Sequence, residues 1–209
     1  MALSDLYSNV QILLRWVHVL AGIIWIGHLY FFNFVNVPFQ GKIAPDVKKA
    51  VNPELLPRAL FWFRWGAMFT FVIGLVLFTQ LYMYQGGGHF GPTSLFHDEQ
   101  GLTSRAVWIL GGMVLGTIMW VNVWFIIWPA QQKIIRGVRD GKPADPALPK
   151  RALMASRLNA YLSGPMLFGM LAASHYGGMN LATAVVAIVL GLAVIWHFIG
   201  ISPKAGSSI

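Results

Sequence analysis

The sequence contains no cysteine. Disulfides, thiolate-ligated iron–sulfur clusters and covalently attached c-type haem all require cysteine, so this chain cannot build any of them by itself. Charged residues are also scarce, at 11% of the chain compared with about 25% in a typical soluble domain. Hydrophobic residues make up 56% of the sequence. This composition predicts an integral membrane protein without a sizeable soluble domain.

Acidic residues are fewer still, and all seven fall outside the long apolar stretches. Transporters coupled to protons or sodium usually keep a carboxylate at mid-membrane, so the sequence disfavours that class. The net charge of +8 would suit a nucleic-acid partner, but the basic residues are distributed as membrane-flanking loops require. We therefore expect the lipid bilayer, and no nucleic acid, as a partner.

Five apolar stretches are long enough to cross a hydrocarbon core, which takes about 20 helical residues. They predict an all-α protein of five transmembrane helices that forms a single membrane domain over residues 1–209. The expected spans are about 12–36, 58–84, 104–129, 152–176 and 180–201. Loops are expected at 40–57, 85–103 and 130–151. Within the third span, the spacing of Gly112 and Gly116 is a signal for close helix packing.

The basic residues orient these spans. Of the 15 Lys and Arg residues, all except Arg15 and Arg105 fall in the loops after the first and third spans, their flanks and the C-terminal tail. The positive-inside rule then predicts an outside N-terminus and a cytoplasmic C-terminus.

The first span carries two histidines, His18 and His28, and polar residues in a span usually face a protein interior and mark a site. Ten helical residues separate them by ~15 Å of depth. His18, Gly22 and Trp25 share one helix face. A glycine one turn from a histidine leaves room for a flat ring such as a porphyrin. The alternative is that Gly22 only allows a neighbouring helix to approach closely.

Two histidines are expected at the outer boundary of the membrane, His18 in the first span and His175 at the end of the fourth. Axial ligation of a haem iron by two imidazoles requires matching depth, which this pair meets within about one turn. Arg15 and Arg105 lie on the same side and suit haem propionates. The alternative is that these residues are interfacial anchors, with His175 bonded to carbonyls at its helix end.

His28 and His197 form a looser inner pair, at depths that differ by ~6 Å. They suggest a second haem or a quinone. For His197, a position at the cytoplasmic interface is the alternative explanation.

Four blocks resemble successive parts of the membrane domain of bacterial urate hydroxylases, the urate oxidase N-terminal family. They are RWVHVLAGIIWIGHLYFFN, ALFWFRWGAMFTFVIG, NVWFIIWPAQQKII and SRLNAYLSGPMLFGMLAASH, and the resemblance covers about 15–176. The first block is also similar to the haem-dependent protoporphyrinogen oxidases of bacteria. The resemblance implies a redox protein of the bacterial inner membrane that passes electrons to a cytochrome c, with His18 and His175 as the functional histidines.

Longer members of that family have more spans and a C-terminal c-type cytochrome, so the chain is expected to be a short form without it. The leading hypothesis is a haem b redox protein, bound to iron through His18 and His175, that serves as an electron-transfer subunit of a respiratory or oxidase complex. One alternative is a urate-hydroxylase-like oxidase that uses a separate cytochrome c. Another is a cofactor-free structural or assembly subunit.

Overall fold

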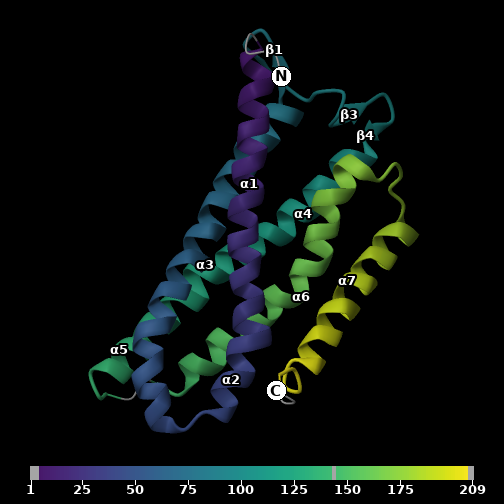
Figure 1. Cartoon of the computed structure of the whole chain (residues 1–209). Helices are drawn as coiled ribbons and strands as arrows, with labels where there is room; N and C mark the ends of the chain where they lie inside the picture. The colour runs from purple at the N-terminus through teal and green to yellow at the C-terminus, as the bar shows by residue number, and fades with distance from the viewer. Residues whose placement is uncertain (1–4, 143–144, 207–209) are drawn as a thin grey trace.

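The computed structural model describes residues 5–142 and 145–206, which form long helices packed side by side (Figure 1). Two short π-helical segments, labelled η, continue α-helices without a break. In chain order the helices are α1 (Leu6–Tyr30), η1 (Phe31–Asn36), α2 (Val37–Lys42), α3 (Pro45–Tyr82), α4 (Ser104–Val121), η2 (Asn122–Ile127), α5 (Trp128–Arg139), α6 (Ala147–His175) and α7 (Leu181–Ile201).

The expected loop at 85–103 folds into two small antiparallel hairpins. They pair β1 (Tyr84–Gly86) with β2 (His89–Phe90) and β3 (His97–Asp98) with β4 (Gly101–Leu102). Both hairpins lie at one end of the helical bundle, near the start of α1, whereas α2, α5 and the end of α7 lie at the other (Figure 1).

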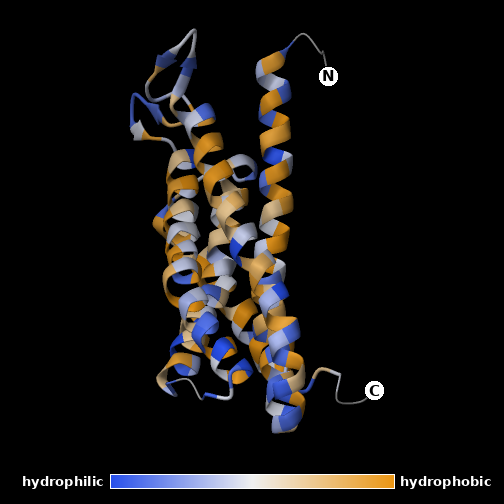
Figure 2. Cartoon of the chain, turned by 90° about the vertical axis from the view of Figure 1, so that its left-hand side faces the viewer, coloured by the Kyte–Doolittle hydropathy of each residue, from blue (hydrophilic) through white to orange (hydrophobic). Residues whose placement is uncertain are grey.

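Four continuous helical stretches are long and apolar enough to cross a membrane: Leu6–Lys42, Pro45–Tyr82, Ser104–Arg139 and Leu181–Ile201. Apolar residues dominate the middle of the helices, whereas polar residues gather towards the ends (Figure 2). The chain is therefore an all-α, multi-pass membrane protein. Of the five expected spans, α6 is not among the four stretches.

The composition of α6 reflects its place in the bundle. It packs against α1, α4, α5 and α7. Its buried positions are mostly small or polar: Ala152, Ala155, Asn159, Ala160, Ser163, Gly169, Ala172 and Ala173. A helix whose neighbours are other helices does not need a lipid-facing apolar surface on every side, and small residues let those neighbours approach closely.

The prediction of a loop at 40–57 is wrong, because only residues 43–44 separate α2 from α3. Pro45 begins α3 at a position where the missing N–H has no helical partner to lose. The side-chain amides of Gln40 and Asn52 exchange two hydrogen bonds, of 2.8 and 3.1 Å, across the turn. The prolines at 53 and 57 lie inside α3 without ending it.

The expected loop at 130–151 is also mostly helical. α5 continues the third span to Arg139, and α6 begins at Ala147. α5 is strongly amphipathic: Ala130 is buried, while Arg136 and Arg139 lie in its last turn, where cations favour the helix dipole.

Glycines fix the contacts of α6 with α4 and with α7. A Cβ at Gly112 would lie 3.2 Å from the Met170 backbone nitrogen, and one at Gly169 would lie 3.2 Å from the Gly112 nitrogen. The expected packing role of Gly112 is thereby confirmed. Gly164 of α6 and Gly191 of α7 meet backbone to backbone, closer than any Cβ would allow.

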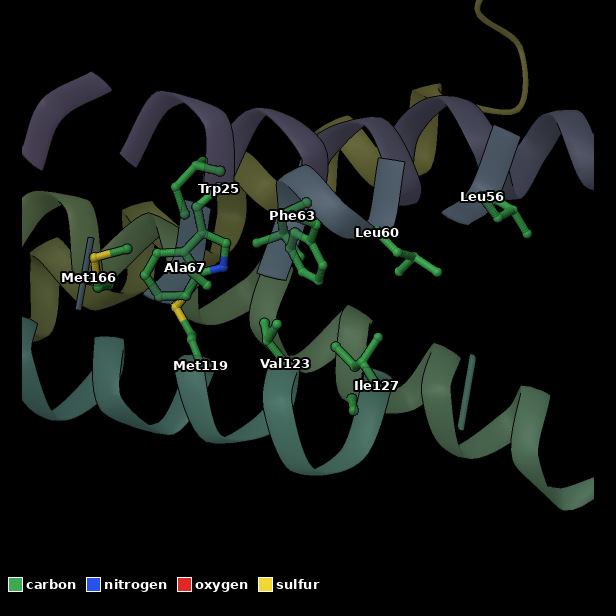
Figure 3. Packing of buried hydrophobic residues seen from close by; sticks show 12 residues of the cluster. Trp25, Leu56, Leu60, Phe63, Ala67, Met119, Val123, Ile127 and Met166 are labelled. Atoms are coloured by element: carbon green, nitrogen blue, oxygen red, sulfur yellow. The ribbon is translucent and has the colours of Figure 1, made fainter. Parts of the chain in front are cut away.

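The main core lies between α1, α3, η2 and α6. Phe63 is its largest fully buried side chain. Figure 3 shows Trp25, Ala67, Met119 and Met166 gathered at one end of this cluster. This core holds α1 against α3 and so fixes the position of His18, about two turns of α1 from Trp25 towards the hairpins.

Candidate cofactor-binding cavity

A cavity of about 500 Å³ lies between α1, α3, α4 and α6. This volume falls within the range of about 300–1,000 Å³ typical of cofactor and ligand sites. Its lining is His18, Val19, Gly22, Ile23, Trp25, Ile26, Gly27, Thr70, Phe71, Gly74, Leu75, Met113, Gly116, Thr117, Met166, Leu167, Met170 and Leu171. The predicted common face of His18, Gly22 and Trp25 is confirmed, because all three line this one cavity.

The imidazole of His18 packs closely against α3. A Cβ at Gly74 would lie 3.0 Å from His18 Cε1 and 3.5 Å from Nδ1. The Nδ1 atom is buried and has no hydrogen-bond partner among residues 5–142 and 145–206. The Thr70 backbone lies near the ring but outside hydrogen-bond geometry to this atom. A buried ring nitrogen of this kind has an unmet capacity to bind a ligand.

The rest of the cavity wall is largely apolar, and beside Gly22, Gly27 and Gly116 no atom comes closer than 3.9 Å to the position of a Cβ. Val19 and Ile23 on α1 and Leu167 and Leu171 on α6 line the cavity and are also exposed on the bundle surface. The cavity therefore opens sideways, between α1 and α6, towards the surface that lipid covers. Such a site suits a large, flat, apolar ligand better than a small polar one.

Arg15 lies three residues before His18, one turn of α1 towards the hairpin end. Its side chain is half-buried, and its Nε atom is buried without a hydrogen-bond partner in the described part of the chain. Arg15 is not in the cavity lining, but it lies within one turn of His18, and its unpaired donor suits an acidic group on a ligand.

Arg105 and His175 lie elsewhere. Arg105 donates from Nε to the Tyr82 hydroxyl over 3.2 Å and from Nη2 to Ser174 Oγ over 3.4 Å. His175 is the last residue of α6 and is exposed. Neither residue is in the cavity lining, so the cavity does not bring His18 and His175 together.

The inner pair of histidines, His28 and His197, does not line this cavity either. His28 places Nδ1 2.7 Å from the Ile24 carbonyl oxygen, so that this hydrogen bond puts the ring proton on Nδ1. His197 is exposed on α7. Neither histidine lines the cavity that contains His18.

Buried amides form a polar cluster that the histidine-centred interpretation of the sequence missed. The Asn33 amide donates to Ser156 Oγ over 2.9 Å, and the Asn122 amide donates to Asn159 Oδ1 over 2.7 Å. Asn33 lies in η1 and Asn122 begins η2, and both face α6. Single-turn π segments often occur at functional sites. Asparagines inside apolar spans were the sequence signal that could have pointed to this cluster.

Comparison with known proteins places these features in a family. The sequence model of the urate oxidase N-terminal family matches residues 92–204, just over half of the chain. The matched segment runs from the second hairpin through α7 and contains Arg105, His175 and His197. It begins later and ends later than the resemblance at 15–176 suggested. Helix α1, which carries His18, precedes the matched segment. Searches of the curated proteins and of the solved structures found no match. The chain belongs to the urate oxidase N-terminal family.

Proposed function

We propose that this protein is a haem b redox protein of the bacterial inner membrane, in which His18 binds the haem iron inside the apolar cavity. The observation that carries the proposal is the His18 imidazole, which lines the apolar cavity and whose Nδ1, on the side packed against Gly74, has no hydrogen-bond partner among the described residues. Electrons would pass to a cytochrome c or to another redox subunit of a larger complex.

The residues of the cavity fit this cofactor. The volume of about 500 Å³ is of the size needed for a ring system, and Gly22 and Gly116 leave open space on the walls made by α1 and α4. Arg15, with its free Nε, would pair with a propionate at the hairpin end of the site. When bound, a haem b carries one electron at a time by cycling between ferrous and ferric iron. The apolar side chains around His18 would keep water from the iron and so favour electron transfer over reactions with solvent.

We further propose that α6 is a fifth span, with the N-terminus outside and the C-terminus in the cytoplasm. Support comes from the length of α6, 29 residues, and from its central position among helices that can cross the membrane. The basic residues of α5 lie at the end opposite the hairpins, which fits a cytoplasmic face there. Arg15 and His18 then lie in the outer half of the membrane, nearer to a periplasmic electron acceptor.

A urate-hydroxylase-like oxidase is the second candidate, and the family match favours it. Urate is a small polar purine whose donors and acceptors need partners, whereas the cavity offers few polar groups besides His18, Thr70 and Thr117. In this case urate would bind at another site and the cavity would hold only the cofactor. Purified protein that oxidises urate while reducing added cytochrome c would establish this activity.

The test of the haem proposal is a visible spectrum of detergent-purified protein, reduced with dithionite minus oxidised in air, from cells supplied with haem precursor. A pyridine haemochrome assay gives the haem content. We expect a sharp b-type α-band and one haem per chain at the His18 cavity, with a second only if the inner pair of His28 and His197 also binds one. A flat spectrum from a well-folded preparation would contradict the proposal and favour a cofactor-free structural subunit.

A further inference from the structure

We infer that Met170, rather than His175, supplies the second axial ligand of the iron bound by His18. This inference rests on the proposed function, because it concerns the same cavity. Three methionines line that cavity, and their thioethers are the only other side chains in the lining that commonly bind haem iron. The geometry of neighbouring helices selects one of them.

The side chain of Met170 runs along α4 from Gly112 to Gly116. Its backbone nitrogen lies 3.2 Å from the position of a Cβ at Gly112, and its terminal methyl carbon lies 3.9 Å from the position of a Cβ at Gly116. The thioether of Met170 is thus at the depth of Gly116, four residues from Gly112 along α4. Gly116 itself lines the cavity.

Gly116 lies at the depth of His18. The rings of Phe71 in α3 and Trp120 in α4 stack with centroids 4.5 Å apart, which aligns the two helices at this level. α3 ends and α4 begins at the hairpins, so the helices run in opposite directions. One turn towards the hairpins from this stack therefore leads to Gly74 on α3 and to Gly116 on α4. Gly74 contacts the His18 ring, so His18 and the Met170 thioether lie at the same depth on different walls of the cavity.

The other two methionines are less suited. Met166 also reaches Gly116, with its Cγ 4.0 Å from the position of a Cβ there, but its side chain is buried in the core beside Trp25 and Ala67 (Figure 3). Met113 lies three residues before Gly116, about 4.5 Å nearer the hairpins at 1.5 Å per residue. Of the two methionines beside Gly116, Met170 is the half-buried one, so its thioether is the more accessible from the cavity.

A thioether suits this wall of the cavity. It is neutral, so that placing it in an apolar, membrane-embedded site requires no charge compensation, and its flexible side chain adapts to the space available. Ligation by one histidine and one methionine raises the reduction potential of haem iron above that of a bis-histidine site. We therefore expect this haem to accept electrons readily.

The test compares wild type with Met170→Leu, Met170→His and, as a matched control on the exposed side of α6, Met154→Leu, with haem content measured for each. In the wild-type ferric protein we expect the weak far-red charge-transfer band of thioether ligation. Met170→Leu should abolish this band, shift the iron to a five-coordinate high-spin spectrum and let the ferrous form bind carbon monoxide. Met170→His should restore a low-spin spectrum without the band and with a lower midpoint potential. Met154→Leu should retain every wild-type signal.

Several results would overturn the inference while leaving the haem proposal intact. One is a haem-loaded wild type without the far-red band. Another is loss of the band in Met113→Leu or Met166→Leu with Met170→Leu unaffected. A change to high spin in His175→Ala, with no change in Met170→Leu, would identify His175 as the ligand instead. Absence of haem from folded wild type would reject both the inference and the proposed function.

Discussion

The ring of His18 occupies the space that a side chain at Gly74 would take. A Cβ there would lie 3.0 Å from His18 Cε1, closer than atoms of packed side chains normally come. Gly74 therefore fixes the orientation of the imidazole at the cavity wall, although the two residues belong to different helices.

Gly74→Ala should displace the His18 ring and lower the haem content of purified protein to less than half of the wild-type value. Alanine favours helix by about 1 kcal/mol over glycine, so a loss of haem would not reflect a weaker α3. The comparison is Gly111→Ala on α4, where a Cβ would meet nothing within 4 Å and the haem content should be unchanged. Equal haem content in both variants would show that Gly74 does not position His18.

Gly164→Ala should loosen α7 from α6, because the added methyl group would collide with the backbone of Gly191. Overpacking of this kind typically costs about 1–3 kcal/mol. Thermal unfolding in detergent should show a lower midpoint for this variant. Gly200→Ala, at the C-terminal end of α7 with open space at its Cβ, should unfold like wild type. A Gly164→Ala protein as stable as Gly200→Ala would argue against the close crossing.

Asn159→Ala should destabilise the bundle, because Asn159 both accepts from the Asn122 amide and donates to the Met119 carbonyl over 2.9 Å. An unsatisfied buried polar group costs about 1–3 kcal/mol, although hydrogen bonds between membrane helices average only about 0.6 kcal/mol. A double-mutant cycle with Asn122→Ala, followed by denaturant unfolding, measures the coupling. We expect a favourable coupling of about 0.5–1 kcal/mol. Strictly additive effects would mean that the two amides do not interact.

The absence of cysteine makes the topology directly measurable. Lys142→Cys and Gly177→Cys flank α6, and both positions are exposed. If α6 crosses the membrane with the proposed orientation, a membrane-impermeant maleimide added to intact spheroplasts should label Gly177→Cys and leave Lys142→Cys unlabelled until the cells are lysed. Labelling of both before lysis would mean that α6 does not span, and labelling of Lys142→Cys alone would reverse the orientation.

Periodicity within one helix predicted part of the site correctly. His18, Gly22 and Trp25 follow helical spacing in the sequence and line one cavity in the structure. Contributions from other helices could not be predicted in this way, because spacing along one helix does not say which residues of another helix face it. Gly74 and Met170 are of this kind.

The predicted pairing of His18 with His175 rested on their common depth and on the family resemblance. Two residues at one level of a membrane can face different sides of a bundle, and His175 is exposed at the end of α6. The predicted loop at 40–57 is mostly helical for another reason. Pro45 lies in the first turn of α3, where a proline is favourable, and Pro53 and Pro57 lie inside α3 without ending it.

The most direct measurement of the central claim is the haem content of His18→Ala beside that of His89→Ala, which alters an exposed histidine in the hairpins. Both proteins should be purified from cells supplied with haem precursor and shown to be equally folded. The account predicts one b-type haem per chain in wild type and His89→Ala and nearly none in His18→Ala. An unchanged haem spectrum in His18→Ala, or no haem in folded wild type, would contradict it.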